Sequence, residues 1–214
     1  MAAVDYNVTQ EATTHDLLTL EECKLLLGLS LTDTTHDQQL ILQISIYSET
    51  VARKCNRIFA KETGVESWRE MFDGRVFLTH FPVKGIDIQN VSAAGSLVDP
   101  SMYTLEERSG KLAYRGTIDP EAIAWPMPVY VTYTGGYDLP TEAPLPLKQA
   151  CAILIMEARM RMFQAQVAGI RQITHRGNRV MFFDPNAVLL KLGGVSPSQK
   201  AVDDLLRQYT RFWV

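Results

Sequence analysis

Histidines, cysteines and nucleophile motifs are the features of this sequence that could perform chemistry. The four histidines are scattered, and none stands beside a cysteine or a carboxylate at the spacing of metal ligands. They are His15, His36, His80 and His175. The chain has no G-x-S-x-G nucleophile elbow, no glycine-rich phosphate loop and no dinucleotide fingerprint. The sequence therefore predicts no catalytic site, no metal and no cofactor, and we expect His80 to be a hydrogen-bonded structural residue.

Arginines gather in one short segment late in the chain. Arg171, Arg176 and Arg179 surround His175 in a predicted hairpin that turns at residues 176–179. Such a cluster favours contact with a phosphate backbone, which attracts cations whatever the base sequence. A solvated loop, or salt bridges to a neighbouring protein, would explain the same residues. We take the three arginines as candidate contacts to a phosphate backbone.

The composition indicates an ordinary globular chain. Of its 214 residues, 46% are hydrophobic and 21% are charged, and the formal net charge is −3. This charge excludes the basic footprint of a dedicated nucleic-acid binder. No apolar run approaches the roughly 20 residues of a membrane span, and the first residues do not resemble a signal peptide. Cys23, Cys55 and Cys151 fall on apolar helix faces, so we expect buried thiols and a cytoplasmic product without membrane contact.

A long helix is predicted over residues 35–59, with Thr35 and Gln38 as its capping box. Apolar residues recur at every third or fourth position and form one stripe. The stripe is Leu40, Ile44, Tyr47, Val51, Cys55 and Ile58. Leu42 and Ile46 fall on the opposite, polar face, where a lone monomer gains nothing by exposing them. A second partner for this helix is the simplest interpretation.

A second long helix is predicted over residues 145–166 and is apolar on two faces. One stripe is Leu147, Cys151, Leu154, Ile155, Ala158 and Met162. The other includes Met156, Met160 and Phe163 on the far side. A helix with two apolar faces is covered on both sides, either within the monomer or by a neighbouring copy.

Between the two helices lie six short β-type segments separated by turn residues. The predicted fold class is therefore α+β: a helical bundle with an inserted small antiparallel β-sheet or barrel and a C-terminal helical arm. The expected organisation is a flexible N-terminal arm over 1–17, a bundle core over 18–63 and 138–168, a β subdomain over 64–137, a hairpin or extended segment over 169–195, and an amphipathic helix over 196–214.

The terminal helix begins with Ser196 as a cap and Pro197 in its first turn. Its apolar stripe ends in five residues that we take as candidate docking residues for a partner. They are Leu205, Leu206, Tyr209, Phe212 and Trp213. Aromatic anchors that enter a groove are a recurrent mode of recognition, although the stripe could also fold back on its own subunit.

Three passages of the sequence, taken in order, carry a family resemblance. They are TLEECKLLLGLSLTDTTHDQQLILQISIYSETVARKCNRIF, VFLTHFPVKGI and VYVTYTGGYDLPTEAPLPLKQACAILIMEAR. Together they resemble the head–tail connector (adaptor) family of tailed bacteriophages, over about two thirds of the chain (residues 18–161). Their order and spacing carry the resemblance, since no single motif is decisive.

The resemblance implies a virion protein that assembles as a ring, usually of twelve subunits, beneath the portal protein. Such rings extend the DNA channel, let double-stranded DNA pass without specific binding, and offer a platform to the next neck or tail protein. They bind the portal through a C-terminal arm. In a ring the contact is heterologous, so one patch meets a different patch on the next copy. We expect Leu42 and Ile46 to form one patch, and Met156, Met160 and Phe163 to form the other.

Three alternatives remain open at this point. A different neck or tail-completion protein of the virion would lack affinity for the portal. An enzyme with an unrecognised site in the β insertion would show activity, although no His, Cys or Ser constellation supports one. A stand-alone binding module that uses the β section would remain monomeric.

Overall fold

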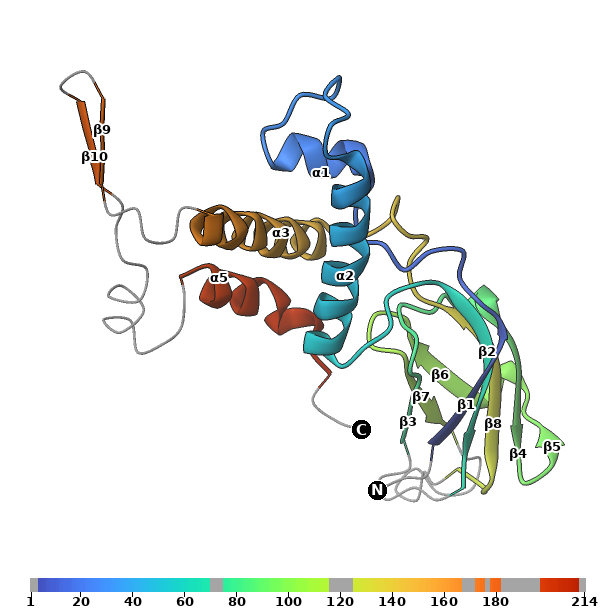
Figure 1. The fold of residues 1–214 in the computed structure, drawn as a ribbon. Coiled ribbons are helices and arrows are strands. Elements are labelled where there is room, and N and C mark those ends of the chain that lie inside the picture. Colours follow the sequence, from blue (N-terminus) through green and yellow to red (C-terminus); the bar gives the residue numbers. More distant parts are fainter. Residues whose placement is uncertain are drawn as a thin grey trace. The chain divides into compact units, whose positions relative to one another are not determined.

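The computed structural model describes residues 4–69, 75–115, 125–166, 172–175, 178–181 and 197–211 (Figure 1). Helices and antiparallel sheets make it an α+β fold, which confirms the predicted class. The chain divides into two compact units. The helical unit comprises Leu17–Val51 and Pro144–Tyr209, and the β unit comprises Met1–Asp16, Ala52–Ala143 and Thr210–Val214.

The helical unit is built from helices that the sequence largely anticipates. They are α1 (Leu20–Leu26), α2 (Asp37–Cys55), α3 (Leu145–Gln166) and α5 (Pro197–Leu206), which continues into the 3-10 turn η3 (Arg207–Tyr209). A capping box starts α1, because Glu22 N donates to Thr19 Oγ1 over 3.1 Å and Thr19 N donates to Glu22 Oε2 over 3.0 Å. Among the described residues, no helix is both long and apolar enough to cross a membrane.

Helix α2 is shorter at both ends than the predicted helix over residues 35–59. Thr35 N donates to Asp33 Oδ1 over 2.9 Å, which holds Thr35 in the preceding turn, and the helix begins only at Asp37. At the other end Asn56 has a φ of 49°, the left-handed conformation that ends many helices. No glycine or proline marks that point in the sequence, so the pattern of apolar residues predicted a helix that continues past it.

The inner stripes of α2 and α3 lie in the core of the helical unit with residues of α1 and α5. The most buried members are Leu17, Leu18, Cys23, Leu40, Ile44, Val51, Leu147, Cys151, Ile155, Val202 and Leu206. Leu17 N donates to Ser48 Oγ over 2.9 Å, which satisfies a backbone donor inside this core. Met162, which the sequence placed on the inner stripe of α3, is instead half exposed because it lies near the end of the helix.

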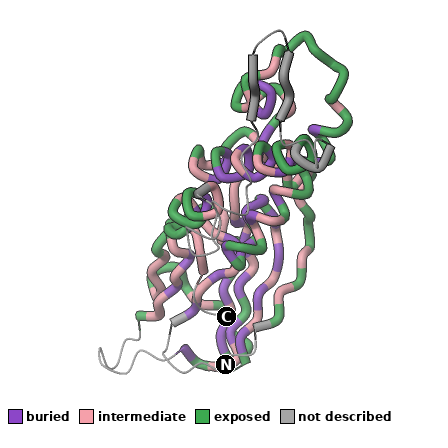
Figure 2. The backbone as a smooth tube through the Cα atoms, turned by 60° about the vertical axis from the view of Figure 1, so that its left-hand side comes forward, coloured by how far each residue is buried: buried purple, intermediate pink, exposed green. Residues whose placement is uncertain are grey.

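The β unit holds two antiparallel sheets, with strand orders β1-β2-β8-β4-β5 and β3-β7-β6. The strands are β1 (Val4–Gln10), β2 (Glu62–Trp68), β3 (Arg75–Phe77), β4 (Ile88–Ala93), β5 (Ser96–Leu97), β6 (Tyr103–Glu106), β7 (Lys111–Tyr114) and β8 (Val129–Gly135). Two 3-10 turns, η1 (Gly85–Asp87) and η2 (Pro100–Met102), precede β4 and β6. Buried residues alternate with more exposed ones along β2 and β8, as Figure 2 shows, so one face of this sheet is internal.

Most of the flexible arm that we expected over 1–17 is ordered from residue 4 onward. Residues 4–10 form β1, which pairs with β2 so that Tyr6 lies opposite Glu66. Gly64 provides the space for this strand, since a Cβ at that position would lie 2.6 Å from the Tyr6 ring. The alternation of Val4, Tyr6 and Val8 with polar residues is a strand pattern, but its partner lies more than fifty residues away and gives no local signal.

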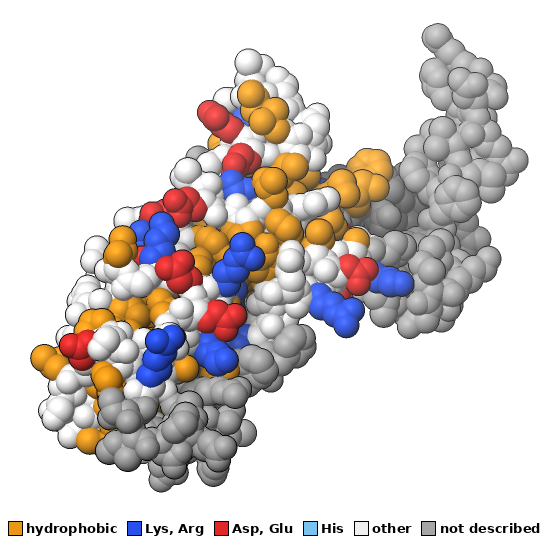
Figure 3. All heavy atoms as spheres, turned by 180° about the vertical axis from the view of Figure 1, so that it is seen from behind, with side chains coloured by type: hydrophobic (Ala, Val, Ile, Leu, Met, Phe, Trp, Pro, Cys, Tyr) orange, Lys and Arg blue, Asp and Glu red, His pale blue; other side chains and the backbone are white. Residues whose placement is uncertain are grey.

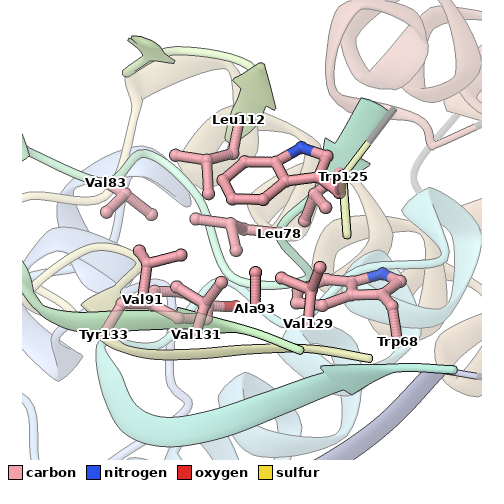
Figure 4. Close-up of a cluster of buried hydrophobic side chains, with 11 residues drawn as sticks. Trp68, Leu78, Val83, Val91, Ala93, Leu112, Trp125, Val129, Val131 and Tyr133 are labelled. Carbon is pink, nitrogen blue, oxygen red and sulfur yellow. The ribbon is translucent and has the colours of Figure 1, made fainter. Parts of the chain in front are cut away.

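The core of the β unit lies between its two sheets. In Figure 4, side chains of the larger sheet point toward Leu112 of β7, with Leu78 and Trp125 between them. The members from the larger sheet are Trp68, Val91, Ala93, Val129, Val131 and Tyr133. Burial of these apolar side chains supplies the main driving force for folding of this unit.

A polar cluster is buried beside this apolar core. The Glu66 carboxylate accepts from Thr79 N over 3.0 and 3.1 Å, from the Thr79 hydroxyl, and from Tyr133 OH over 2.9 Å. His80 N donates to the oxygen of the same Tyr133 over 3.0 Å. Glu66 and His80 are both fully buried, and burial raises the pKa of Glu66. The cluster therefore joins β2, β8 and the segment after β3 through polar groups that water does not reach.

His80 should make the stability of the protein depend on pH. Burial lowers its pKa to about 4, and the charges of Arg57 and Arg211 act in the same direction, followed by His15. The Glu62 carboxylate lies 3.2 Å from His80 Nε2. Below about pH 6.5 the His80 imidazole takes up a proton in the unfolded chain but stays neutral in the folded chain. The free energy of unfolding is therefore at its full value above about pH 6.5 and falls as the pH decreases toward about 4.

The loss over this pH range is expected to reach at most about 3 kcal/mol. Urea unfolding of the protein and of His80→Gln between pH 7.5 and pH 4.5 measures it. The free energy of unfolding should fall more steeply for the unchanged protein than for His80→Gln. Glu66 contributes to both curves and cancels in their difference, so parallel curves would show that His80 does not titrate in this way.

Candidate subunit interface

The outer faces of α2 and α3 expose the apolar residues that the sequence singled out. Leu42 and Ile46 of α2, and Met156, Met160 and Phe163 of α3, are between 46% and 61% exposed in the isolated subunit. On both helices these residues follow helical spacing, so each set forms a stripe. Figure 3 shows apolar side chains gathered over the helical unit on the face turned to the viewer. Contiguous apolar surface of this kind marks interaction sites on soluble proteins.

Helices α2 and α3 contact each other at one end of the helical unit. Gln39 Nε2 donates to Met162 Sδ over 3.7 Å, which places the first turn of α2 beside the last turns of α3. Ile41 and Met162 are each about half exposed at this end as well. The apolar pattern of the sequence predicted that Met162 is buried. Its position near the end of α3 could have indicated that it is more exposed than the rest of the stripe.

A leucine-rich turn adds further exposed apolar surface to the same unit. Leu25 and Leu26 at the end of α1 and Leu31 in the following loop are between 50% and 64% exposed. We call these three residues the leucine turn. The sequence LLLGLSL places five leucines around one glycine, which is more than a short helix can bury.

Lys24 fixes the conformation of the leucine turn from beneath. Its side chain is buried, and Nζ lies 2.6 Å from Asp37 Oδ1. The same Nζ donates to the carbonyl oxygen of Asp33 over 2.7 Å and to that of Leu31 over 3.4 Å. A buried ammonium with three partners holds the loop to the start of α2, so the turn is presented in one conformation.

The terminal helix only partly matches the docking role that the sequence suggested. Helix α5 packs against α3, and Leu206 is buried in the core of its own subunit. Leu205 and Tyr209 are half-buried. Phe212 and Trp213 lie outside the described residues. Leu206 therefore reaches a partner only if α5 leaves α3, whereas Leu205 and Tyr209 keep some accessible surface.

The candidate arginines lie in and around a small hairpin. It consists of β9 (Gln172–His175) and β10 (Asn178–Met181), which pair antiparallel with Arg179 opposite Thr174. The predicted turn spanned residues 176–179, but residues 178 and 179 belong to β10. Arg171 and Arg176 lie outside the described residues.

Three titratable residues of the β unit lie in its interior. Glu66 and His80 are fully buried, and Glu62 is 6% exposed. Within the described parts of the chain, no three His, Cys, Asp or Glu side chains are grouped closely enough to hold a metal ion. The sequence did not indicate that the carboxylates of Glu62 and Glu66 are buried. Charged residues on one face of a strand usually mark the face that is turned to solvent.

Comparisons with known proteins identify the fold. No protein-family model matches the sequence, and no curated protein matches it significantly. Solved structures do match. A chain from the neck of the empty gene transfer agent (GTA) particle, computed with C6 symmetry, has a TM-score of 0.56 and 13% identity, covering 98% of this chain and 97% of its own.

Two further structures agree with the first. A chain from the virion of the native gene transfer agent particle has a TM-score of 0.54 and 14% identity, covering 98% of this chain and 96% of its own. A chain from the neck of the native particle, computed with C12 symmetry, has a TM-score of 0.51 and 14% identity, covering 98% and 97%. The protein thus shares its fold, over nearly its whole length, with chains from the neck and virion of a gene transfer agent.

Proposed function

We propose that this protein is a structural subunit of the neck of a tailed phage or phage-like particle. The observation that carries the proposal is the likeness of fold to neck chains over 98% of the sequence. The resemblance of residues 18–161 to the head–tail connector family supports the same role. In this role the subunit forms a ring beneath the portal, extends the DNA channel, and provides the platform for the next neck or tail protein.

The ring contact pairs two different helix faces. The exposed stripe of α2, with Leu42 and Ile46, packs against the exposed stripe of α3, with Met156, Met160 and Phe163, on the next copy. Such a contact is heterologous and closes into a ring when the rotation per subunit divides a full turn. The similar neck chains come from assemblies computed with C6 and C12 symmetry, which is consistent with a cyclic arrangement here.

The DNA in such a ring must slide, so tight or sequence-specific binding would oppose the function. A net charge of −3 with a few local arginines suits this requirement. We assign Arg171, Arg176 and Arg179 to the lumen, where they contact the passing phosphate backbone.

The C-terminal residues form the contact with the portal. Leu205 and Tyr209 offer partly accessible surface at the end of α5, and Phe212 and Trp213 follow them in the sequence. Leu206 joins this contact only in a subunit whose α5 has moved, since it is buried here.

Light scattering after size exclusion, with the protein alone and with the portal protein, tests this function. We expect a complex whose mass holds six or twelve copies of the 24.1 kDa chain, formed alone or on the portal. A monomer under both conditions would contradict the proposal. A ring that fails to bind the portal in a pull-down would instead favour another neck or tail-completion protein.

A further inference from the structure

The β9–β10 hairpin stands apart from the other described helices and strands of its chain. Its register runs from Gln172 opposite Met181 to His175 opposite Asn178, so each strand has only four residues. The two strands form a separate two-stranded sheet, as Figure 1 shows. Among the described residues, no other helix or strand packs extensively against it.

A hairpin of this size needs an external surface. Isolated two-stranded hairpins are at best marginally stable in water, because they bury too little apolar area to offset the cost of ordering the backbone. The register pairs Ile173 with Val180, two β-branched residues that favour strands and burial. A surface outside the described part of this chain is therefore a candidate partner for the hairpin.

The position of the hairpin in the sequence restricts where this partner lies. Five residues separate the last residue of α3 from Gln172, so the Cα atoms of Gln166 and Gln172 lie at most about 22 Å apart. The last turns of α3 carry Met160 and Phe163, which belong to the candidate contact with the next copy. The hairpin thus leaves the subunit at the edge where a neighbouring copy is expected.

The leucine turn is the surface that fits the hairpin. It exposes Leu25, Leu26 and Leu31, and Lys24 holds it in one conformation by its contacts to Asp37 and to two backbone carbonyls. A rigid apolar surface binds a partner at a lower entropic cost than a mobile one. Lys24 also ties this turn to the start of α2, the helix whose stripe forms the other half of the subunit contact.

We propose that the β9–β10 hairpin of one copy packs on the leucine turn of the next copy. This inference rests on the proposed ring, and it adds a second contact to the pairing of α2 with α3. Each copy then gives a hairpin to one neighbour and receives one from the other, as a heterologous interface requires.

Hydrogen exchange tests the inference on rings of the full-length protein, formed alone or isolated in neck complexes with the portal. The amides of residues 172–181 should exchange at least tenfold more slowly in the ring than in the monomeric Met160→Asp variant. Rings of a Leu25→Glu/Leu26→Glu variant should lose this protection. The matched control is Ile86→Glu, since Ile86 is a 90% exposed residue of the β unit and should leave the protection unchanged.

A cysteine pair provides a second test that does not depend on charged variants assembling. The double variant Leu26→Cys/Ile173→Cys should form disulfides between copies and give covalent multimers on a non-reducing gel, whereas each single variant should not. Rings without slower exchange in 172–181, protection that survives Leu25→Glu/Leu26→Glu, or absence of cross-linked multimers would overturn the inference while leaving the ring intact. Failure to obtain any ring would instead contradict the proposed function.

Discussion

Ile46→Asp and Met160→Asp should each give a folded subunit that no longer forms rings. Both side chains are about half exposed in the single subunit, so an aspartate at either position is solvated and the fold is retained. In the assembled ring the same carboxylate would be buried against apolar side chains without a partner, which costs several kcal/mol. A loss of about 3 kcal/mol weakens each contact more than a hundredfold. Light scattering should report the mass of a monomer for both variants, with unchanged circular dichroism.

Leu145→Asp is the matched control for Met160→Asp. Leu145 is an exposed apolar residue on the same face of the same helix, but it lies 15 residues before Met160 and therefore about 22 Å away along the helix axis. The Leu145→Asp variant should form a ring with the same mass as the ring of the unchanged protein. A ring of normal mass with either Ile46→Asp or Met160→Asp would show that the stripe concerned is not in the contact.

Mixing the two variants separates a heterologous contact from a self-complementary one. The Ile46→Asp subunit keeps an intact α3 stripe, and the Met160→Asp subunit keeps an intact α2 stripe. An equimolar mixture should therefore form heterodimers through the one remaining good contact, and it should stop there because the outer stripes carry aspartate. Either variant alone should stay monomeric, and rings in the mixture would refute the pairing of α2 with α3.

The sequence predicted the helical unit well because its helices follow a clear periodicity. Helix α3 has the predicted bounds, and its two apolar stripes differ in burial: Cys151 and Ile155 are fully buried, whereas Met156 and Met160 are half exposed. The ends of α2 could not be predicted as well, since the left-handed Asn56 is not distinguished from other polar residues by the pattern. Periodicity reports which face is apolar, but it does not say where the backbone leaves the helix.

The features that the sequence did not reveal depend on residues far apart in the chain. Strand β1 was missed because it is defined by pairing with β2, and the buried Glu66 was missed because its partner Tyr133 lies on another strand. The leucine turn was missed for a related reason. Lys24 reads as a solvent-facing residue, and only its contacts to Asp37 and to the loop carbonyls show that it supports the turn.

The β unit also depends on one glycine whose replacement should have a large effect. Gly136 has a φ of 107°, where residues with a side chain are strained, and a Cβ there would lie 2.3 Å from the carbonyl oxygen of Ala60. Neighbouring backbone bonds fix this approach: Tyr137 N donates to Phe59 O over 2.8 Å, and Lys61 N donates to Tyr137 O over 3.0 Å. The clash is therefore with backbone that cannot move without breaking these bonds.

Gly136→Ala should lower the free energy of unfolding by about 4 kcal/mol, from about 1–2 kcal/mol of backbone strain and the remainder from the clash. Urea unfolding of alanine variants at two other glycines of the β unit separates the backbone strain from the clash. Gly95 has a φ of 82° with open space around it, so Gly95→Ala should show the strain alone, and Gly85→Ala, with open space and no such φ, should change stability by less than about 0.5 kcal/mol. If Gly136→Ala proved no less stable than Gly95→Ala, the close approach of residues 60 and 136 would not exist in solution. A large difference between them would instead establish that this crossing of two backbone segments, and not the turn conformation alone, closes the sheet at the end of β8.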